Sequence, residues 1–259
     1  MKLERYPGNP ILSPHPDHPW EDLAVFNPAA WYDEPRREVL LLYRAAEAGP
    51  EYKCWFGLAL TQDFQHWIRA GWLTDPLLDD RDAILFPEKI NGRYALIHRP
   101  LEWVGPPYGT DQACAWISFA DDLLGFPAAP SNLLLKNEHP WETAKLGVNT
   151  PPIRTPYGWF TLYHAVGPDK FYRLGAVLLD FENPAIVRHR TPAWLMQPEA
   201  DYEREGFYRG VCFPCGTVVI DGTLFVYYGG GDRVCAVATC DFTALLQHLR
   251  SCPGSRRHR

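Results

Sequence analysis

The chain has 259 residues, of which 46% are apolar and 14% aromatic, enough to bury a large core in one all-β domain. A net charge of -6 and the lack of a basic stripe argue against a nucleic-acid partner. The apolar runs are too short to cross a membrane and the start of the chain lacks a signal-peptide core. We therefore expect a cytoplasmic protein that binds neither nucleic acid nor membrane.

A unit of about 60 residues recurs four times along the chain, which is typical of repeat architectures. Each unit opens with a short segment around a proline and continues with an apolar run. Turn-forming pairs such as Asn91-Gly92 and Asp221-Gly222 precede three of the four runs, and each unit is predicted to contain a β-hairpin. The prolines are Pro28, Pro87, Pro151 and Pro214, and the runs are 39–44, 94–99, 159–164 and 224–228.

A further strand completes each unit and ends near an aspartate. These aspartates are Asp63, Asp121, Asp180 and Asp241. Consecutive strands at a fixed spacing are typical of a β-propeller, which places one four-stranded sheet in each repeat. The sequence thus predicts an all-β, single-domain β-propeller over residues 1–259, with four visible repeats. Apolar side chains at helical spacing over 241–249, with Asp241 as N-cap, predict a short C-terminal helix.

Polar residues occupy early-strand or strand-end positions in separate repeats. They are Asn27, Arg44, Arg99, His164 and Asp232. In a propeller the innermost strands converge at one mouth, so equivalent positions of different repeats become neighbours. Each residue taken alone could equally be a hairpin end that faces water. Their recurrence predicts a shared polar site.

Seven cysteines are scattered along the chain, and Cys212 and Cys215 form a C-x-x-C pair. Such a pair can bind zinc or carry redox chemistry, but no second pair or paired histidine follows it. Small thiols also pack well in a β-sheet core. We therefore expect packed cysteines and neither a metal site nor a bound cofactor.

Ten short strings, in order along nearly the whole chain, resemble glycoside hydrolase family 130. They include Val25-Phe26-Asn27-Pro28, Leu85-Phe86-Pro87-Glu88-Lys89-Ile90-Asn91-Gly92, His98-Arg99-Pro100, Gly158-Trp159-Phe160-Thr161-Leu162-Tyr163-His164 and Tyr227-Tyr228-Gly229-Gly230-Gly231-Asp232. That family consists of β-mannoside phosphorylases and related inverting β-mannosidases on a five-bladed propeller. The resemblance implies a small carbohydrate substrate, with inorganic phosphate as the co-substrate of the phosphorylases.

The resemblance also implies roles for single residues. The positions that match the phosphate site of the phosphorylases are Arg44, Arg99, Lys145 and His164, with Tyr172 near a matching tyrosine. Guanidinium, ammonium and imidazole groups suit a phosphate dianion in geometry and charge. Asp232 matches an aspartate that binds mannose hydroxyls, and Asn27 meets the same pocket. The same cations could instead form structural ion pairs.

One motif of the family is absent. Family members carry Glu-Asp-Pro-Arg at the start of the second blade, and its aspartate is the acid that protonates the leaving oxygen; this string does not occur here. An entire unit is missing between the repeats that begin at Pro28 and Pro87. The ring would close with four blades, or with a degenerate fifth built from residues 1–20 and 47–79.

Inverting cleavage needs a proton donor opposite the nucleophile, so a substitute acid is required. Glu88 is the first candidate because it lies beside Pro87 on a predicted inner strand, and Asp82 and Asp22 follow. Glu88 could also form a structural pair with Lys89.

Three functions remain open at this point. The first is inverting phosphorolysis of β-mannosides, or the reverse synthesis, with a non-standard general acid. The second is a non-catalytic propeller that binds a sugar or a sugar phosphate and kept the basic pocket. The third is an inverting β-glycoside hydrolase, in which water replaces phosphate. The resemblance also leaves open a homo-oligomer, because relatives commonly assemble.

Overall fold

The computed structural model describes residues 11–33, 35–48, 53–63, 65–75, 77–124, 126, 131–206 and 208–254. Its residues group into two compact units: the described residues of 1–81 and 120–129 form the first, and 82–119 with 131–206 and 208–254 form the second. No helix within these ranges is long and apolar enough to cross a membrane. The side chain of Asn27 lies outside the described part of the structure.

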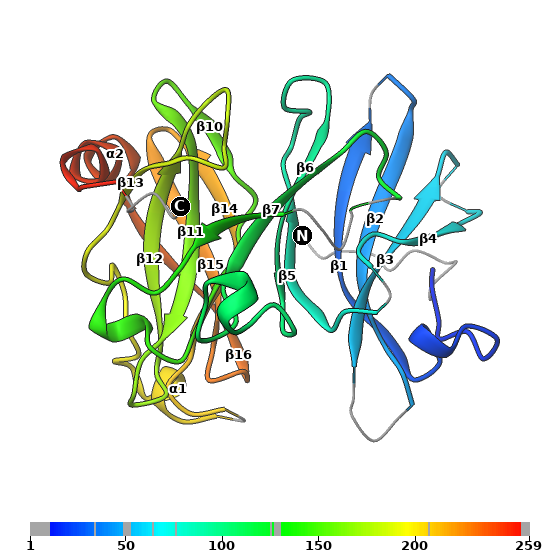
Figure 1. Cartoon of the computed structure of the whole chain (residues 1–259), viewed down its shortest axis with the longest axis horizontal. Helices are drawn as coiled ribbons and strands as arrows, with labels where there is room; N and C mark the ends of the chain where they lie inside the picture. Colours follow the sequence, from blue (N-terminus) through cyan, green and yellow to red (C-terminus); the bar gives the residue numbers. More distant parts are fainter. Residues whose placement is uncertain are drawn as a thin grey trace, which may run out of the picture. The chain divides into compact units, whose positions relative to one another are not determined.

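The first unit contains one antiparallel sheet whose strands follow the order of the sequence (Figure 1). Its strands are β1 (Ala24–Asp33), β2 (Glu38–Ala46), β3 (Cys54–Thr61) and β4 (Ile68–Trp72), and the 3-10 turn η1 (Pro19–Glu21) precedes them. The predicted run 39–44 lies in β2, the second strand. The register of β1 against β2 shifts between Phe26 and Ala29. This bulge falls at Pro28, which has no N–H to donate to the ladder.

The second unit contains three further sheets in the described residues (Figure 1). The first consists of β5 (Asp80–Leu85), β6 (Tyr94–Pro100), β7 (Ala115–Ala120) and β8 (Asn132–Leu135), paired in that order. The next consists of β10 (Ile153–Thr155), β11 (Gly158–Val166), β12 (Tyr172–Leu179) and β13 (Val187–Arg190), and β9 (Lys145–Val148) also pairs with β11. The last consists of β14 (Cys212–Ile220), β15 (Thr223–Gly230) and β16 (Val234–Asp241).

Four short helical elements complete the second unit. They are η2 (Pro106–Tyr108), η3 (Pro140–Glu142), α1 (Asp201–Arg204) and α2 (Phe242–Ser251). The predicted C-terminal helix is α2, and Asp241 caps it by accepting a hydrogen bond from the Ala244 N–H at 2.7 Å. Leu246 and Leu249 are buried and pack in one core cluster with β11, β12 and β15, and α2 lies beside β13 (Figure 1).

The predicted hairpins form, for the physical reasons that the sequence suggests. Asn91 and Gly92 have φ of 49° and 80°, and Asp221 and Gly222 have φ of 48° and 79°, which are left-handed values that two-residue hairpin turns require. Two of the recurring aspartates, Asp63 and Asp180, cap turns. Asp180, for example, accepts hydrogen bonds from the backbone N–H groups of Glu182 and Asn183 at 3.0 and 2.8 Å.

The alternative of a fifth blade from residues 1–20 and 47–79 is wrong in the described part of the chain. Strands β3 and β4 fall in that range, but β3 pairs with β2 and β4 pairs with β3 in the first sheet. Each of the four repeats therefore supplies one sheet. In the described residues the last sheet has three strands, and α2 follows directly after β16.

A recurring side-chain contact, which the sequence analysis did not identify, holds the second strand of three sheets. A buried tyrosine donates its hydroxyl hydrogen bond to a buried glutamate in the helical turn that precedes the sheet. The pairs are Tyr43 with Glu21 at 2.8 Å, Tyr163 with Glu142 at 2.8 Å and Tyr228 with Glu203 at 2.7 Å. Opposite two of these rings stand glycines, Gly57 and Gly175, where a Cβ would come within 2.4 Å of the ring. Only glycine leaves room for the tyrosine there.

Candidate active site

His164 is the centre of the candidate site. It follows Tyr163 on β11, and successive side chains of a strand point to opposite faces, so the two residues belong to different surroundings. The His164 side chain is fully buried. Its ring centroid lies 5.5 Å from that of Tyr172 and 4.9 Å from that of Phe213. These aromatic contacts hold the plane of the imidazole.

A chain of hydrogen bonds, here called the Asp82 relay, connects Arg99, Asp82, Asn149 and His164. Arg99 on β6 donates from Nε to Asp82 Oδ2 at 2.5 Å. Asn149, directly after β9, donates from Nδ2 to Asp82 Oδ1 at 3.1 Å. The other end of the same amide, Asn149 Oδ1, is hydrogen-bonded to His164 Nδ1. Four segments of the second unit thus meet in one polar cluster.

The Asp82 relay fixes the tautomer of His164. An ionised carboxylate only accepts hydrogen bonds, so Asp82 must face the NH2 of Asn149. The amide oxygen of Asn149 then faces His164, and Nδ1 of the imidazole must carry the proton. In the neutral ring the lone pair is left on Nε2.

The pKa values of the two titrating groups agree with this assignment. Burial acts to raise the pKa of Asp82, but the charge of Arg99 and the hydrogen bonds from Arg99 and Asn149 together outweigh burial and lower that pKa to about 2. Burial lowers the pKa of His164 to about 3, against the attraction of Asp82 and with the help of the positive charges of Arg99 and Lys145. At neutral pH the relay therefore holds a carboxylate and a neutral imidazole.

The Nε2 atom of His164 is buried and has no hydrogen-bond partner among the described residues. Leaving a buried acceptor unpaired costs about 1–3 kcal/mol. Asp82 also carries a cost, because its φ of 56° lies in the left-handed region that non-glycine residues avoid. Strained and unpaired groups of this kind cluster at binding and catalytic sites.

Gly147 lets the backbone of β9 approach the Asp82 relay. It pairs with His164 in the β9–β11 ladder. A Cβ at this position would lie 2.2 Å from Asp82 Oδ2, 2.9 Å from His164 Cε1 and 3.0 Å from Arg99 Nε. Glycine is thus required here by the packing of the site, and the sequence analysis missed it.

Tyr172 stacks on the imidazole, and the charges of Lys145 and Asp232 act on each other near it. Lys145 Nζ lies 4.4 Å from the centroid of the Tyr172 ring, which is a cation–π distance. Burial raises the pKa of Tyr172 to about 12, so its hydroxyl stays protonated at neutral pH. Asp232 is exposed, in the turn between β15 and β16; partial desolvation raises its pKa, and the charge of Lys145 acts against this.

The remaining predicted site residues are Glu88, Arg44 and Asp22. Glu88 is in the β5–β6 turn, with its side chain 47% exposed and an ion pair at 3.2 Å to Arg154 Nη1. That turn leads into the start of β6, whereas Arg99 is near its end. Arg44 and Asp22 belong to the first unit, where Arg44 Nη2 contacts Cys54 Sγ at 3.0 Å and Asp22 Oδ1 accepts the Ala48 N–H at 2.7 Å.

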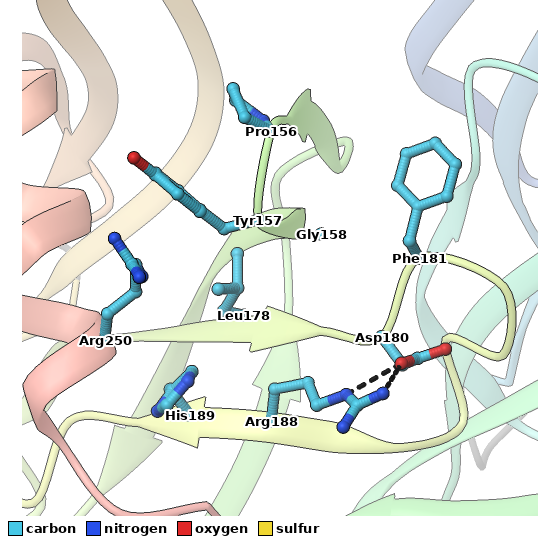
Figure 2. Close-up of a pocket in the computed structure, with 9 residues that line it drawn as sticks. All are labelled: Pro156, Tyr157, Gly158, Leu178, Asp180, Phe181, Arg188, His189 and Arg250. Carbon is cyan, nitrogen blue, oxygen red and sulfur yellow. Dashed lines mark hydrogen bonds and ion pairs between the residues drawn. The ribbon is translucent and has the colours of Figure 1, made fainter.

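A surface hollow of about 340 Å³ lies near the start of β11 (Figure 2). Its charged groups already have partners: Arg188 pairs with Asp180, and the Arg250 guanidinium lies 4.0 Å from the centroid of the Tyr157 ring. Gly158 at the hollow and His164 are six strand residues apart, which is roughly 20 Å. The hollow is thus separate from the Asp82 relay, and we assign it no catalytic role.

Comparison with known proteins identifies the family. Residues 53–251 match the model of a family described as beta-1,4-mannooligosaccharide phosphorylase, glycoside hydrolase family 130. The chain belongs to this family. A 1,2-beta-oligomannan phosphorylase of Thermoanaerobacter sp. is 34% identical over 92% of this chain and 97% of the relative. A beta-1,2-mannobiose phosphorylase of Listeria innocua is 36% identical over 71% of this chain and 49% of the relative.

The solved Listeria innocua beta-1,2-mannobiose phosphorylase, in complex with beta-1,2-mannobiose, matches with a TM-score of 0.77 and 29% identity. The match covers 93% of this chain and 64% of that chain, so this family 130 member spans less than two thirds of it. The prediction of a β-propeller fold is confirmed, and each of the four sheets is a blade. The alignment with the Thermoanaerobacter relative extends over 301 positions, more than the 259 residues of this chain. The relative therefore carries segments that this chain lacks.

Proposed function

We propose that this family 130 protein is a glycoside phosphorylase, which cleaves β-mannosides with inorganic phosphate and inversion and also runs the reverse synthesis. Membership of the family and the phosphorylase relatives support the reaction type. The observation that carries the proposal is the buried Nε2 of His164, which no described residue hydrogen-bonds and which lies under the influence of the positive charges of Arg99 and Lys145. An oxyanion beside the imidazole would meet both cations.

In the proposed reaction an oxygen of hydrogenphosphate attacks the anomeric carbon, and the bond from that carbon to the leaving oxygen breaks. The products are α-mannose 1-phosphate and the released sugar, whose new hydroxyl takes one proton. The proton that hydrogenphosphate loses balances the one that the sugar gains. Arg99 and Lys145 would compensate the charge of the anion and hold it in line for attack.

Roles within the site follow from the contacts. Asp82 fixes the Arg99 guanidinium and, through Asn149, the His164 imidazole. Tyr172 covers one face of that imidazole. Asp232, in its exposed turn, would accept hydrogen bonds from sugar hydroxyls. Arg44 and Asn27 keep their predicted roles in phosphate and sugar binding.

The proton donor is a separate part of the proposal. With a pKa of about 2, Asp82 is ionised at neutral pH and has no proton to give, so we assign it to positioning. Glu88 is exposed and paired with Arg154, which does not favour it as the acid. Asp22 stays a candidate in the first unit.

A phosphorolysis assay tests the proposal. The protein is incubated with phosphate and either β-1,2-mannobiose or β-1,4-mannobiose, and α-mannose 1-phosphate is quantified by coupled assay or 31P NMR. We expect product from the β-1,2 substrate, because relatives that match most of the chain or the solved fold are named for β-1,2-mannosides. Mannose release without phosphate would indicate a hydrolase instead.

The second candidate function is a non-catalytic propeller that binds a sugar phosphate. The missing Glu-Asp-Pro-Arg string and the ionised state of Asp82 favour it, because both deprive the site of a proton donor. Saturable binding of α-mannose 1-phosphate without turnover in either direction would support this function over phosphorolysis. Loss of that binding in His164→Gln would locate it at the Asp82 relay.

A further inference from the structure

We infer that the site selects an oxyanion that itself carries a hydroxyl group, namely hydrogenphosphate, and rejects donor-free dianions such as sulfate. The selecting atom is His164 Nε2, which accepts a hydrogen bond from the P–OH group. The inference rests on the proposed function for the position of the anion and adds the chemical form of the anion that the site takes.

The tautomer of His164 carries the argument. Nε2 can act as an acceptor only if the proton of the neutral ring is on Nδ1. Two contacts place the proton on Nδ1. His164 Nδ1 faces Asn149 Oδ1, and Asn149 Nδ2 donates to Asp82 Oδ1 at 3.1 Å. Arg99 Nε, at 2.5 Å from Asp82 Oδ2, keeps the carboxylate ionised and thus an acceptor only.

Each alternative state of the network either loses a buried hydrogen bond or adds a buried charge. If the proton moved to Nε2, the lone pair of Nδ1 would face the amide oxygen of Asn149. If the Asn149 amide turned over, its oxygen would face the Asp82 carboxylate. If the ring took a second proton, a new charge would form in a fully buried place close to Arg99 and Lys145.

Selection among dianions depends on whether the anion carries an O–H group, not on its charge. Hydrogenphosphate, sulfate and monofluorophosphate are all tetrahedral dianions, so Arg99 and Lys145 attract them alike. Of the three, only hydrogenphosphate has an O–H to donate. A sulfate oxygen would place its lone pair against that of Nε2, and both would stay desolvated and unpaired.

Titration calorimetry at about pH 8, where phosphate is mainly the dianion, tests the inference with these three anions. We expect phosphate to bind at least about tenfold more tightly than sulfate or monofluorophosphate. In Asn149→Ala the imidazole is free to present Nε2–H, so the ratio should fall below about threefold. In His164→Gln the amide can donate or accept, so the ratio should fall similarly even if Asn149→Ala does not fold.

His248→Gln is the matched control, because His248 is an exposed histidine on α2. It should keep the full ratio between phosphate and sulfate. Equal binding of phosphate and sulfate by the unaltered protein would overturn the inference, as would a ratio that survives in His164→Gln. The proposed function can fail separately. A protein that discriminates between the anions but makes no mannose 1-phosphate would support the inference and contradict the proposed phosphorylase activity.

Discussion

Tyr163 and His164 are neighbours on β11, but the polar networks on the two faces of this strand end differently. On one face the Tyr163 hydroxyl donates to Glu142 Oε1 at 2.8 Å, and Arg190 Nη2 lies 2.8 Å from the same oxygen. On the other face the Asp82 relay runs from Arg99 to His164 and ends at Nε2, which has no partner among the described residues. Both networks are buried, yet only one is closed.

The difference separates a structural network from a binding site. A buried ion pair maintains the fold, because its opposite charges already lie beside each other. An open network keeps a group unpaired at a cost, which a ligand can recover on binding. The closed network should therefore respond to mutation in stability, and the open one in anion binding and pH dependence.

Arg190→Met should produce the largest loss of stability. The guanidinium is buried between Glu142 and Tyr163, so its removal leaves the Glu142 carboxylate charged and without its cation. We expect a loss of about 3–5 kcal/mol in the free energy of unfolding, measured by urea denaturation. The double variant Arg190→Met, Glu142→Gln should recover part of it. A loss below about 1 kcal/mol would contradict the closed network.

Arg99→Ala should lower both stability and phosphate affinity. The sequence alone suggests a modest effect on stability, since residues at strand mouths contribute little core area. In the structure Arg99 is buried and paired with Asp82. Its removal leaves the buried Asp82 carboxylate without its cation, which lowers the free energy of unfolding by about 3 kcal/mol. Adding Asp82→Asn should restore stability but not phosphate binding. Restoration of both would show that Arg99 does not contact the anion.

Gly147→Ala should disturb the open network without unfolding the protein. The new methyl group would overlap Asp82 Oδ2, and overpacking of this kind costs about 1–3 kcal/mol. We expect at least a tenfold loss of phosphate affinity by calorimetry, because Asp82 must move away from Arg99 or Asn149. Gly216→Ala is the matched control, since nothing lies within 4 Å of a Cβ there. Unchanged phosphate affinity in Gly147→Ala would place the anion elsewhere.

The pH dependence of stability should reveal the neutral His164. In the unfolded chain the imidazole binds a proton near its ordinary pKa of 6.5, whereas burial keeps the folded imidazole neutral down to about pH 3. This contribution is therefore fully present above pH 6.5 and is lost as the pH falls below it, by up to about 1.4 kcal/mol per pH unit. His164→Gln should show a shallower loss between about pH 6 and 4. If the curves of unfolding free energy against pH ran parallel for the unaltered protein and His164→Gln, His164 would titrate normally and the prediction would be wrong.

The repeat period made the fold predictable from sequence. Hairpin turns at Asn91-Gly92 and Asp221-Gly222 and the Asp241 cap are local features, and local backbone chemistry decides them. The tyrosine–glutamate pairs do have a signal in the sequence. The string His18-Pro19-Trp20-Glu21 recurs as His139-Pro140-Trp141-Glu142. That recurrence could have located the turns that hold Tyr43 and Tyr163.

The site was less predictable, because its contacts join strands that are distant in sequence. Asp82 stood out as a carboxylate, but only its 2.5 Å contact with Arg99 makes it a positioning residue instead of an acid. Asn149 and Gly147 carry no chemical signature by themselves. Their importance depends on the direction of side chains from three other segments after the sheets have packed.

The central claim concerns one proton, and 15N NMR of histidine-labelled protein measures it directly. Assigned by comparison with His164→Gln, the ring nitrogens of His164 should show a protonated Nδ1 and an unprotonated Nε2 at neutral pH. On addition of phosphate, the Nε2 resonance should shift as the atom accepts a hydrogen bond, and sulfate at the same concentration should leave it in place. A protonated Nε2, or a His164 spectrum indifferent to phosphate, would contradict the account.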